Sequence, residues 1–405
     1  MSERISTLSP STNKVVCEWD QTTTPEAENV CRDPAKAWLT FRKMPFAQRK
    51  EIAMKALALI QERKQTLGEE LTLQMGRPIA FGAKKLLLGQ TEAGFKNWIV
   101  EESIGLTVII FAWNFPYLII VNSFPPLYSP EIGSTNTLNE LVKIPDINLV
   151  TLTGSTQGGR LIREAIASRF VPVNLELSGN DPAYVGPDAD LQYVAEQLVH
   201  GAVFNAGQSC CAVERVYVHT DINDASVAEV QKYKLRDLAD HIVNVGPVIS
   251  RAAQKSINSQ VWDASAKGAV NSTSPNPAFT SPSAEGNYVV PTVSTQVSHD
   301  MVVMREQTFG PALPIIRVSD KEAVQLMNDD DYGMSVSVWT EDLATGEKLL
   351  KLLDAGTVFI NRCDYSNPDQ VRTRWKNSGM GYTHGPKAVD PLLKLKRYHI
   401  REKQG

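Results

Sequence analysis

Strand-like and helix-like segments alternate through the middle of this chain, and this alternation limits its fold more than any other feature. The segments 148–155 (NLVTLTGS), 172–179 (PVNLELSG) and 212–219 (AVERVYVH) have the apolar content of buried strands. Helical patterns at 158–168 and 191–207 separate them. Strands joined by helices pair in parallel within one sheet, so the sequence predicts an α/β fold with doubly wound sheets. The alternating pattern of 212–219 predicts one buried and one exposed face.

The N-terminal third adds helical and extended segments. Residues 33–76 have helical periodicity that Gly76 and Pro78 end, 92–104 read as a strand or hairpin arm, and 136–145 as a short helix. The apolar run 106–128 is long enough for a membrane span. Asn114 and Pro116 interrupt it, which favours a buried strand at 106–112, a turn at 113–116 and then a helix or second strand. Residues 270–288 are rich in Ser, Pro and Asn and predict a surface loop.

Composition excludes several classes of protein. The chain is 42% hydrophobic and 21% charged, which is typical of an ordinary globular protein. A formal net charge of −4 gives no electrostatic reason to bind nucleic acid or an anionic membrane. The five cysteines form no CxxC pair and no zinc spacing, so we expect no metal site and no disulfide framework. The polar N-terminus lacks the apolar core of a signal peptide, and a reducing, cytoplasmic setting fits best.

Three short segments carry polar groups suited to chemistry. In TGSTQGG (153–159) a glycine-containing turn leads from a strand into a helix, whose N-terminus favours phosphate. Glu176 ends an apolar strand, where desolvation can raise its pKa and make it a general base. The amide of Asn114 can donate to an oxyanion. Each also has an ordinary structural explanation: a strand–helix turn, a solvated carboxylate and a turn residue.

Two adjacent cysteines, Cys210 and Cys211, stand just before the strand at 212–219. Either could be a nucleophile or a small packed residue. A cysteine hydrolase would need a histidine base, and none of the six histidines lies in a recognisable partner motif. That alternative is therefore disfavoured.

Taken together and in this order, these segments resemble the aldehyde dehydrogenase superfamily. Its recurring motifs match WNFP (113–116), TGSTQGG (153–159), LELSG (175–179), GQSC (207–210) and TFGP (308–311). The closing segments AGTVFIN (355–361) and KNSGMG (376–381) also agree, as does the separation of Glu176 from Cys210. The resemblance covers nearly the whole chain in patches.

The resemblance implies NAD(P)-dependent oxidation of an aldehyde to a carboxylic acid. Cys210 would be the nucleophile that forms a thiohemiacetal and then a thioester, Asn114 would hold the oxyanion and Glu176 would activate water. Cys211 would be a packed residue. The implied cofactor-binding residues for NAD or NADP are Trp113, Gly154, Ser155, Thr156, Gln157, Gly158, Gly159, Gln307 and Phe309.

The chain also departs from the family pattern. After 127 it lacks the strand with a Lys-Pro-Ser segment and the following helix, which we expect to remove an interior strand and a ribose contact. Gln307 stands where the family has a second glutamate that grips the nicotinamide ribose, and an amide accepts hydrogen bonds more weakly than a carboxylate. A degenerate relative with impaired or absent cofactor binding and no activity is therefore the alternative.

Domain organisation follows from the same resemblance. A shortened dinucleotide-binding domain is expected at 1–177, with an oligomerisation arm near 86–104. A catalytic domain is expected at 178–371 and a C-terminal oligomerisation segment at 372–405. In the family the arm and tail pair across a dimer, so a homo-oligomer is expected, with KLKRYHIREK as the pairing strand and Trp98 and Val100 on the other side of the contact. The expected small-molecule partner is an aldehyde.

Overall fold

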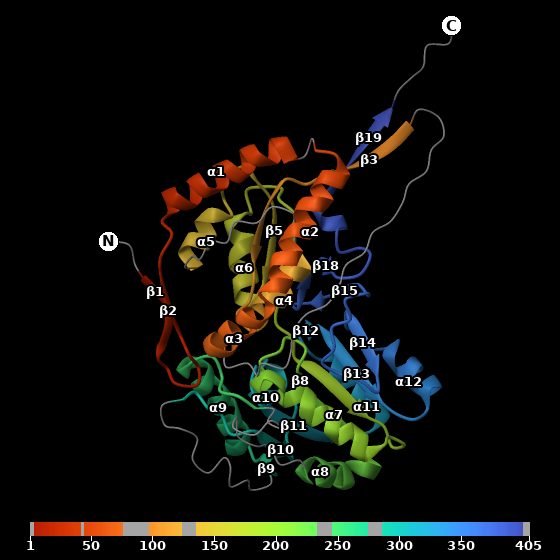
Figure 1. The fold of residues 1–405 in the computed structure, drawn as a ribbon. Helices are drawn as coiled ribbons and strands as arrows, with labels where there is room; N and C mark the ends of the chain where they lie inside the picture. The colour runs from red at the N-terminus through yellow and green to blue at the C-terminus, as the bar shows by residue number, and fades with distance from the viewer. Residues whose placement is uncertain are drawn as a thin grey trace.

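The computed structural model describes residues 4–41, 44–75, 97–123, 135–232, 245–273 and 286–399. In Figure 1 a four-stranded sheet and its helices fill the upper part, and a seven-stranded sheet fills the lower part. Gly76, Pro78, residues 86–96 of the expected arm, most of the loop expected at 270–288 and the tail from 400 lie outside the described residues.

The larger sheet has the strand order β14-β13-β7-β8-β11-β10-β9. Its strands are β7 (Asp181–Val185), β8 (Val213–His219), β9 (Val270–Asn271), β10 (Thr292–Thr295), β11 (Ala312–Val318), β13 (Ser335–Trp339) and β14 (Thr357–Ile360). All neighbours pair in parallel except β9 with β10. The prediction of a doubly wound α/β sheet is confirmed.

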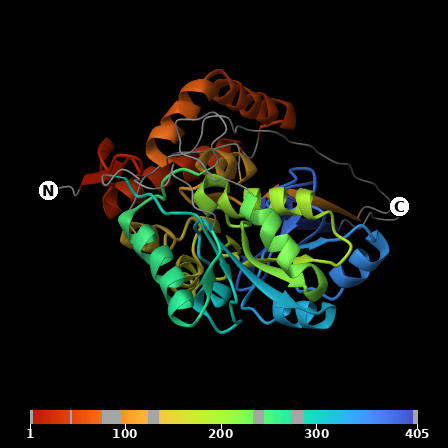
Figure 2. The same cartoon turned by 90° about the horizontal axis from the view of Figure 1, so that it is seen from below.

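Helices cover both faces of this sheet (Figure 2). They are α7 (Leu191–Val203), α8 (Asn223–Lys232), α9 (Arg251–Ala266), α10 (Val302–Arg305), α11 (Asp320–Asn328) and α12 (Leu343–Leu350). One apolar cluster joins the sheet to α7 and α8, and a second joins it to α10 and α11. Because β8 is buried between them, its residues from Val213 to Val218 are all buried. The expectation that β8 exposes one face is therefore wrong, since an interior parallel strand is covered on both sides.

The smaller sheet has the order β17-β6-β5-β4. Its strands are β4 (Leu106–Ile110), β5 (Ile147–Thr153), β6 (Val173–Glu176) and β17 (Gly379–Met380), and the first three are parallel. Its helices are α4 (Pro116–Ser123), α5 (Thr135–Leu141) and α6 (Thr156–Ala165). Since β4 pairs directly with β5 and is the edge strand of the described sheet, a further strand would lie beyond β4. The expectation of a lost interior strand is corrected to an edge position.

The N-terminal third begins with an antiparallel hairpin, β1 (Arg4–Leu8) and β2 (Val15–Asp20). The helical pattern expected at 33–76 is divided into α1 (Thr24–Phe41), α2 (Phe46–Glu62) and α3 (Lys64–Met75). Pro45 precedes α2 at its N-cap and Arg63 ends it. A proline lacks the N–H that a continuing helix needs, which explains the first break.

The C-terminal segment returns to both parts of the molecule. It contains β12 (Tyr332–Gly333) paired with β16 (Trp375–Lys376), β15 (Arg372–Thr373) paired with β18 (Tyr382–Thr383), and β19 (Leu393–His399). Strand β19 pairs with β3 (Asn97–Ser103) in the same chain, and the two project together from the body in Figure 1. Trp98 stacks on Tyr398 with ring centroids 5.2 Å apart. The domain boundaries at 177 and 371 stay a prediction.

Candidate active site

Cys210 lies in a turn between α7 and β8. The 3₁₀ helix Phe204–Gly207 leads into this turn, with Asn205, Ala206 and Gly207 all at positive φ. The buried side chain of Gln208 fixes the turn, because its Nε2 donates to the Asn205 carbonyl at 2.9 Å and its Oε1 accepts from Ile249 N at 2.8 Å. Cys210 is half-buried at this point.

Glu176 ends β6, and its carboxylate lies between two arginines. Arg372 Nε forms an ion pair with Glu176 Oε1 at 3.1 Å, and Arg374 Nη2 donates to Glu176 Oε2. The side chains of Glu176, Arg372 and Arg374 are only 15%, 11% and 0% exposed. The carboxylate is therefore held from both sides inside the protein.

Strand pairing explains why these arginines reach Glu176. Gly379 of β17 pairs with Glu176 of β6, and Leu177 N donates to the Ser378 carbonyl at 2.9 Å. Side chains two residues apart in an extended chain point to the same side. Asn174 and Glu176 are two residues apart on β6 and point to the same side. Arg374 contacts both, since it also donates through Nη1 to Asn174 Oδ1 at 3.2 Å.

The arginines determine the protonation state of Glu176. Burial alone would raise the pKa of Glu176, but the charges of Arg372 and Arg374 and the hydrogen bond from Arg374 outweigh it and lower the pKa to about 2. Glu176 is thus ionised at neutral pH. Because a general base is most effective when its pKa lies near the working pH, this carboxylate is a weak base.

The sulfur of Cys210 lies beside both partners of this ion pair. Its Sγ atom is 3.7 Å from Glu176 Oε1 and 3.0 Å from Arg372 Nη2. A hydrogen bond from Cys211 and the positive charge of Arg372 lower the pKa of the Cys210 thiol, against the opposing effects of burial and of Glu176. The structure therefore brings the expected nucleophile and the expected base together.

Asn114 contacts the turn that carries Cys210. It is buried, and its Nδ2 donates to the Gln208 carbonyl at 3.1 Å. Its Oδ1 is also buried and has no hydrogen-bond partner among the described residues. The side chain therefore stands next to the turn, with one amide donor used to hold it.

Cys211 differs clearly from its neighbour. It is buried, and its Sγ lies 3.2 Å from Asp364 Oδ1, which also accepts from Ser209 Oγ at 2.8 Å. Hydrogen bonding to Cys210 and burial raise the pKa of the Cys211 thiol. Cys211 thus remains a thiol that supports the turn.

The glycine-containing segment 154–159 forms the turn between β5 and α6. Ser155 is the N-cap of α6, with its Oγ accepting from Gly158 N at 3.0 Å, and Thr156 N donates to Ser178 Oγ at 3.3 Å. A Cβ at Gly159 would lie 2.7 Å from the side chain of Leu177, so only glycine permits this close packing of α6 on β6. Ser155 and Gln157 are exposed at the open end of the helix.

The aromatic residues Trp113 and Phe309 pack edge to face, with ring centroids 5.7 Å apart. Phe309 has a φ of 51°, and its N–H donates to Glu214 Oε1 at 3.1 Å, while Thr308 N donates to Glu214 Oε2 at 3.1 Å. Burial raises the pKa of Glu214 to about 8, against the hydrogen bonds from Phe309 and Thr308. Gln307 directly precedes Thr308 in the chain. Its Nε2 is a buried donor with no partner among the described residues.

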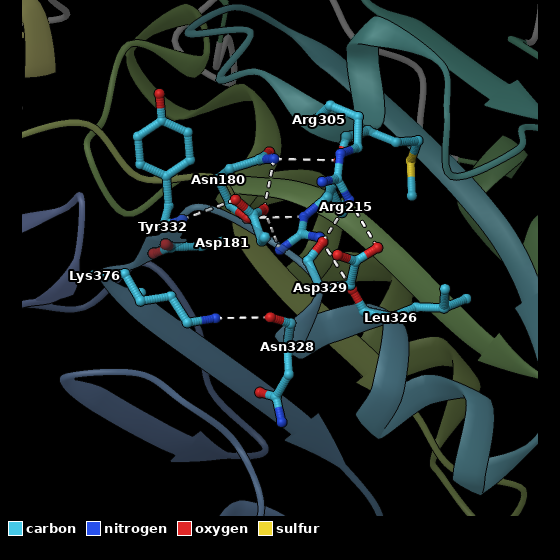
Figure 3. Close-up of polar contacts among 12 residues, drawn as sticks. Asn180, Asp181, Arg215, Arg305, Leu326, Asn328, Asp329, Tyr332 and Lys376 are labelled. Atoms are coloured by element: carbon cyan, nitrogen blue, oxygen red, sulfur yellow. Dashed lines mark hydrogen bonds and ion pairs between the residues drawn. The ribbon is translucent and has the colours of Figure 1, made fainter.

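A buried polar cluster lies next to the site, at the start of β7 and β8. Arg215 Nη2 forms an ion pair with Asp330 Oδ2 at 2.7 Å, and both side chains are 1% exposed. Asn180 Nδ2 donates to the same oxygen at 2.8 Å, and its carbonyl accepts from Arg215 Nε at 2.9 Å. Figure 3 shows Arg215 and Asn180 within this set of contacts. The cluster ties β7 and β8 to the segment after α11.

Sequence reasoning missed Arg372, Arg374, Glu214 and the neutral His384. Two arginines in the alternating RTR segment 372–374, just before the KNSGMG motif, were the available signal, because buried arginines require an acidic partner. Burial and the nearby charge of Arg372 lower the pKa of His384 to about 4. His384 Nδ1 lies 3.2 Å from Ser366 Oγ.

Among the described residues, no helix has the length and apolar content needed to cross a bilayer.

Comparison with known proteins gives one family. The family model described as the aldehyde dehydrogenase family matches residues 1–88 and 132–398, leaving the segment that carries Asn114 unmatched. A 3,6-anhydro-alpha-L-galactose dehydrogenase of Streptomyces coelicolor is 30% identical over 355 residues, covering 77% of this chain and 72% of that protein. A succinate-semialdehyde dehydrogenase [NADP(+)] of Mycolicibacterium paratuberculosis is 27% identical over 440 residues, covering 93% and 92%.

Solved structures agree. A structure of 3,6-anhydro-L-galactose dehydrogenase has a TM-score of 0.87 to this chain at 26% identity, and the similarity covers 98% of this chain and 96% of that one. Other solved structures with this fold are complexes with NADP or NAD+. With the family model matching well over half of its length, this chain belongs to the aldehyde dehydrogenase family.

Proposed function

We propose that this chain oxidises an aldehyde to a carboxylic acid with NAD or NADP, and that Cys210 is its nucleophile. The observation that carries the proposal is the position of the Cys210 sulfur, 3.7 Å from Glu176 Oε1 and 3.0 Å from Arg372 Nη2. A cysteine with a lowered pKa beside a carboxylate and a cation has the groups that acyl chemistry needs.

The residues present fit the nicotinamide and phosphate parts of a dinucleotide. The open N-terminus of α6, with the exposed Ser155 and Gln157, suits phosphate. The Trp113–Phe309 pair offers an aromatic surface, and the unpartnered Nε2 of Gln307 is a buried donor in need of an acceptor such as a ribose hydroxyl. Gly154, Thr156, Gly158 and Gly159 complete the turn. Bound there, the dinucleotide supplies the hydride acceptor.

The side chains of the site perform the remaining steps. The Cys210 thiolate attacks the aldehyde carbon, and the new S–C bond leaves negative charge on the oxygen. Asn114 and the backbone N–H of Cys210 are the donors for that oxygen. After oxidation the acyl group is a thioester on Cys210. Glu176 then accepts a proton from the attacking water, the C–S bond breaks and the carboxylic acid leaves.

The ion pairs of Glu176 affect the balance of these steps. A carboxylate with a pKa of about 2 is a weak base for water, so hydrolysis of the thioester is expected to be slower than its formation. We therefore expect this chain to turn over slowly and to accumulate its acyl form.

Turnover of the purified chain tests the proposal. NAD or NADP is added with a panel of aldehydes, and the absorbance of the reduced nicotinamide is followed. The proposal expects production that Cys210→Ala abolishes and that Cys211→Ala lowers without abolishing, because Cys211 packs against Asp364 and only supports the ionisation of Cys210. Production that survives in Cys210→Ala would overturn the assignment of the nucleophile.

A second candidate is an inactive relative. The two arginines on Glu176 favour it, because they lower the pKa of the expected base. Its signature is the absence of turnover with every aldehyde, together with no protection of Cys210 from alkylation by NAD or NADP. If NAD or NADP protects Cys210 but no aldehyde is oxidised, the defect lies in catalysis. If NAD or NADP gives no protection, the defect lies in cofactor binding.

A further inference from the structure

Two arginines and one carboxylate are buried together at this site, so their charges do not balance. The side chains of Arg372 and Arg374 are 11% and 0% exposed, and they share the single negative charge of Glu176. A buried cation without an anion is strongly unfavourable. A second anion close to these guanidinium groups would offset the remaining positive charge.

The other carboxyl groups nearby are poor candidates for that anion. Burial raises the pKa of Asp181 to about 7, although Ser335 donates to it through both N and Oγ. Burial and the neighbouring Cys211 raise the pKa of Asp364 well above its usual value. Burial thus opposes the ionisation of both carboxyl groups, and among the described residues neither forms an ion pair with Arg372 or Arg374.

The sulfur of Cys210 is in the right place. Arg372 Nη2 lies 3.0 Å from it, within hydrogen-bond distance of a thiolate, while its Nη1 lies 3.9 Å from Cys211 Sγ. Among the described residues, Arg374 forms no hydrogen bond with either sulfur and is instead held by Glu176, Asn174 and Thr383 Oγ1. The two arginines share Glu176 but differ in their other partners, and Arg372 is the one directed at the nucleophile.

We propose that Arg372 is a catalytic residue of this chain, whose guanidinium keeps Cys210 as the thiolate while Arg374 holds Glu176 from the opposite side. The inference rests on the proposed role of Cys210 as the nucleophile. In this arrangement Arg372 and Arg374 are balanced by Glu176 and the sulfur, and Cys210 is ready to attack without first giving its proton to a base.

The other groups around Cys210 act on this ionisation in both directions. Glu176 and any ionised Asp181 raise the pKa of the thiol, while the hydrogen bond from Cys211 lowers it together with Arg372. His384, which faces Glu176 and Arg372, is neutral above pH 4. Among the described residues, Arg372 is thus the only cation that contacts the Cys210 sulfur.

The pH dependence of Cys210 alkylation tests the inference without any need for turnover. The full-length protein is treated with iodoacetamide over a range of pH, and the modification of Cys210 is resolved from that of Cys211 by peptide fragmentation. The wild type is expected to have a midpoint below the value of about 8.5 for a free cysteine. A wild-type midpoint at or above that value overturns the inference, and this result needs no variant to fold.

Variants test whether Arg372 is the residue that lowers the alkylation midpoint of Cys210. In Arg372→Met the midpoint is expected to rise by at least one pH unit, equivalent to an about tenfold lower thiolate fraction at neutral pH. Arg372→Lys, which keeps the charge, should restore most of the shift. The matched control is Arg362→Met, because Arg362 is exposed and stacks on Tyr365. The midpoint is used because better access of the reagent to Cys210 changes the rate but not the midpoint.

The outcomes separate this inference from the proposed function. A midpoint in Arg372→Met equal to that of the wild type overturns the role of Arg372, even if the enzyme turns over aldehydes. A shifted midpoint supports that role, and it does so even if no aldehyde is oxidised, in which case only the proposed function fails.

Discussion

Arg372 Nη2 lies 3.0 Å from Cys210 Sγ, while Nε of the same guanidinium lies 3.1 Å from Glu176 Oε1. One side chain therefore contacts both the expected nucleophile and the expected base. This contact favours the thiolate of Cys210 and weakens Glu176 as a base. Attack on the aldehyde is helped and hydrolysis of the thioester is hindered by the same charge.

The first prediction concerns the order of rates. If hydrolysis is the slow step, rapid mixing of enzyme, aldehyde and NAD(P) should give a burst of reduced nicotinamide before the steady state. The burst is expected to approach one equivalent per active chain, as measured by stopped-flow absorbance. A linear progress curve from the first turnover would show that an earlier step is limiting.

Acid stability should depend on Glu176. Its folded pKa of about 2 is below the unfolded value of about 4.3, so its ionised form stabilises the fold above pH 4.3 and this stabilisation is lost as pH falls towards 2. Glu176→Gln should be destabilised at pH 7 by about 3 kcal/mol, because it leaves two buried arginines without a carboxylate. Urea unfolding at several pH values measures this.

Urea unfolding at several pH values also tests whether the arginines hold Glu176. The difference in the free energy of unfolding between wild type and Glu176→Gln should narrow steadily from pH 5 towards pH 2. A difference that stays constant over this range would mean that Glu176 is not held by the arginines in solution.

Removal of the buried ion pair between Arg215 and Asp330 should destabilise the protein strongly. Asp330→Asn leaves a fully buried guanidinium with only neutral partners, which typically costs about 3–5 kcal/mol. The adjacent Asp329→Asn is the matched control, because Asp329 is 60% exposed and its pair with Arg305 is worth at most about 1 kcal/mol. Equal losses in urea unfolding for the two variants would contradict this account of the cluster.

Two glycines at positive φ should respond differently to alanine. A Cβ at Gly207 would lie 2.2 Å from the Gly310 carbonyl oxygen, so Gly207→Ala must displace the turn before Cys210. Gly268 also has a positive φ but has open space around it, so Gly268→Ala should cost only about 1–2 kcal/mol of backbone strain. Thermal unfolding should show a clearly larger loss for Gly207→Ala, and similar losses would argue against the close contact.

Glu214 is predicted to act on dinucleotide binding from a distance. It accepts the N–H groups of Thr308 and Phe309, so Glu214→Ala should release this loop and the aromatic pair of Phe309 with Trp113. The Kd for NAD or NADP is expected to rise about tenfold, measured by quenching of protein fluorescence. Glu347→Ala, at an exposed position on α12, is the control, and an unchanged Kd in Glu214→Ala would remove Glu214 from the cofactor site.

Local patterns predicted much of this structure. The strands at β5, β6 and β8 and the helices α6 and α7 follow from apolar periodicity and glycine, and the strand-end position of Glu176 follows from the same pattern. The burial of both faces of β8 did not follow, because exposure depends on which helices cover a strand. Glu214 and Arg215 are adjacent in β8 and therefore point to opposite faces, and each looks exposed until its buried partners are known.

The arginines beside Glu176 were missed for a similar reason. Arg372 and Arg374 reach it only because β17 adds to β6 from about 200 positions further along the chain. Such non-local pairing leaves no local signal in the sequence. The sequence predicted the two segments that form β3 and β19, but it predicted their pairing across a dimer. In the structure they pair within one chain. The oligomeric state stays a prediction.

The most direct test of the central claim is site-resolved mass spectrometry of the wild-type enzyme, quenched in acid while it oxidises an aldehyde with NAD or NADP. The account predicts the mass of the acyl group on Cys210, approaching one per chain, with Cys211 unmodified. Continued formation of reduced nicotinamide with Cys210 unmodified, or the acyl group on another residue, would contradict it.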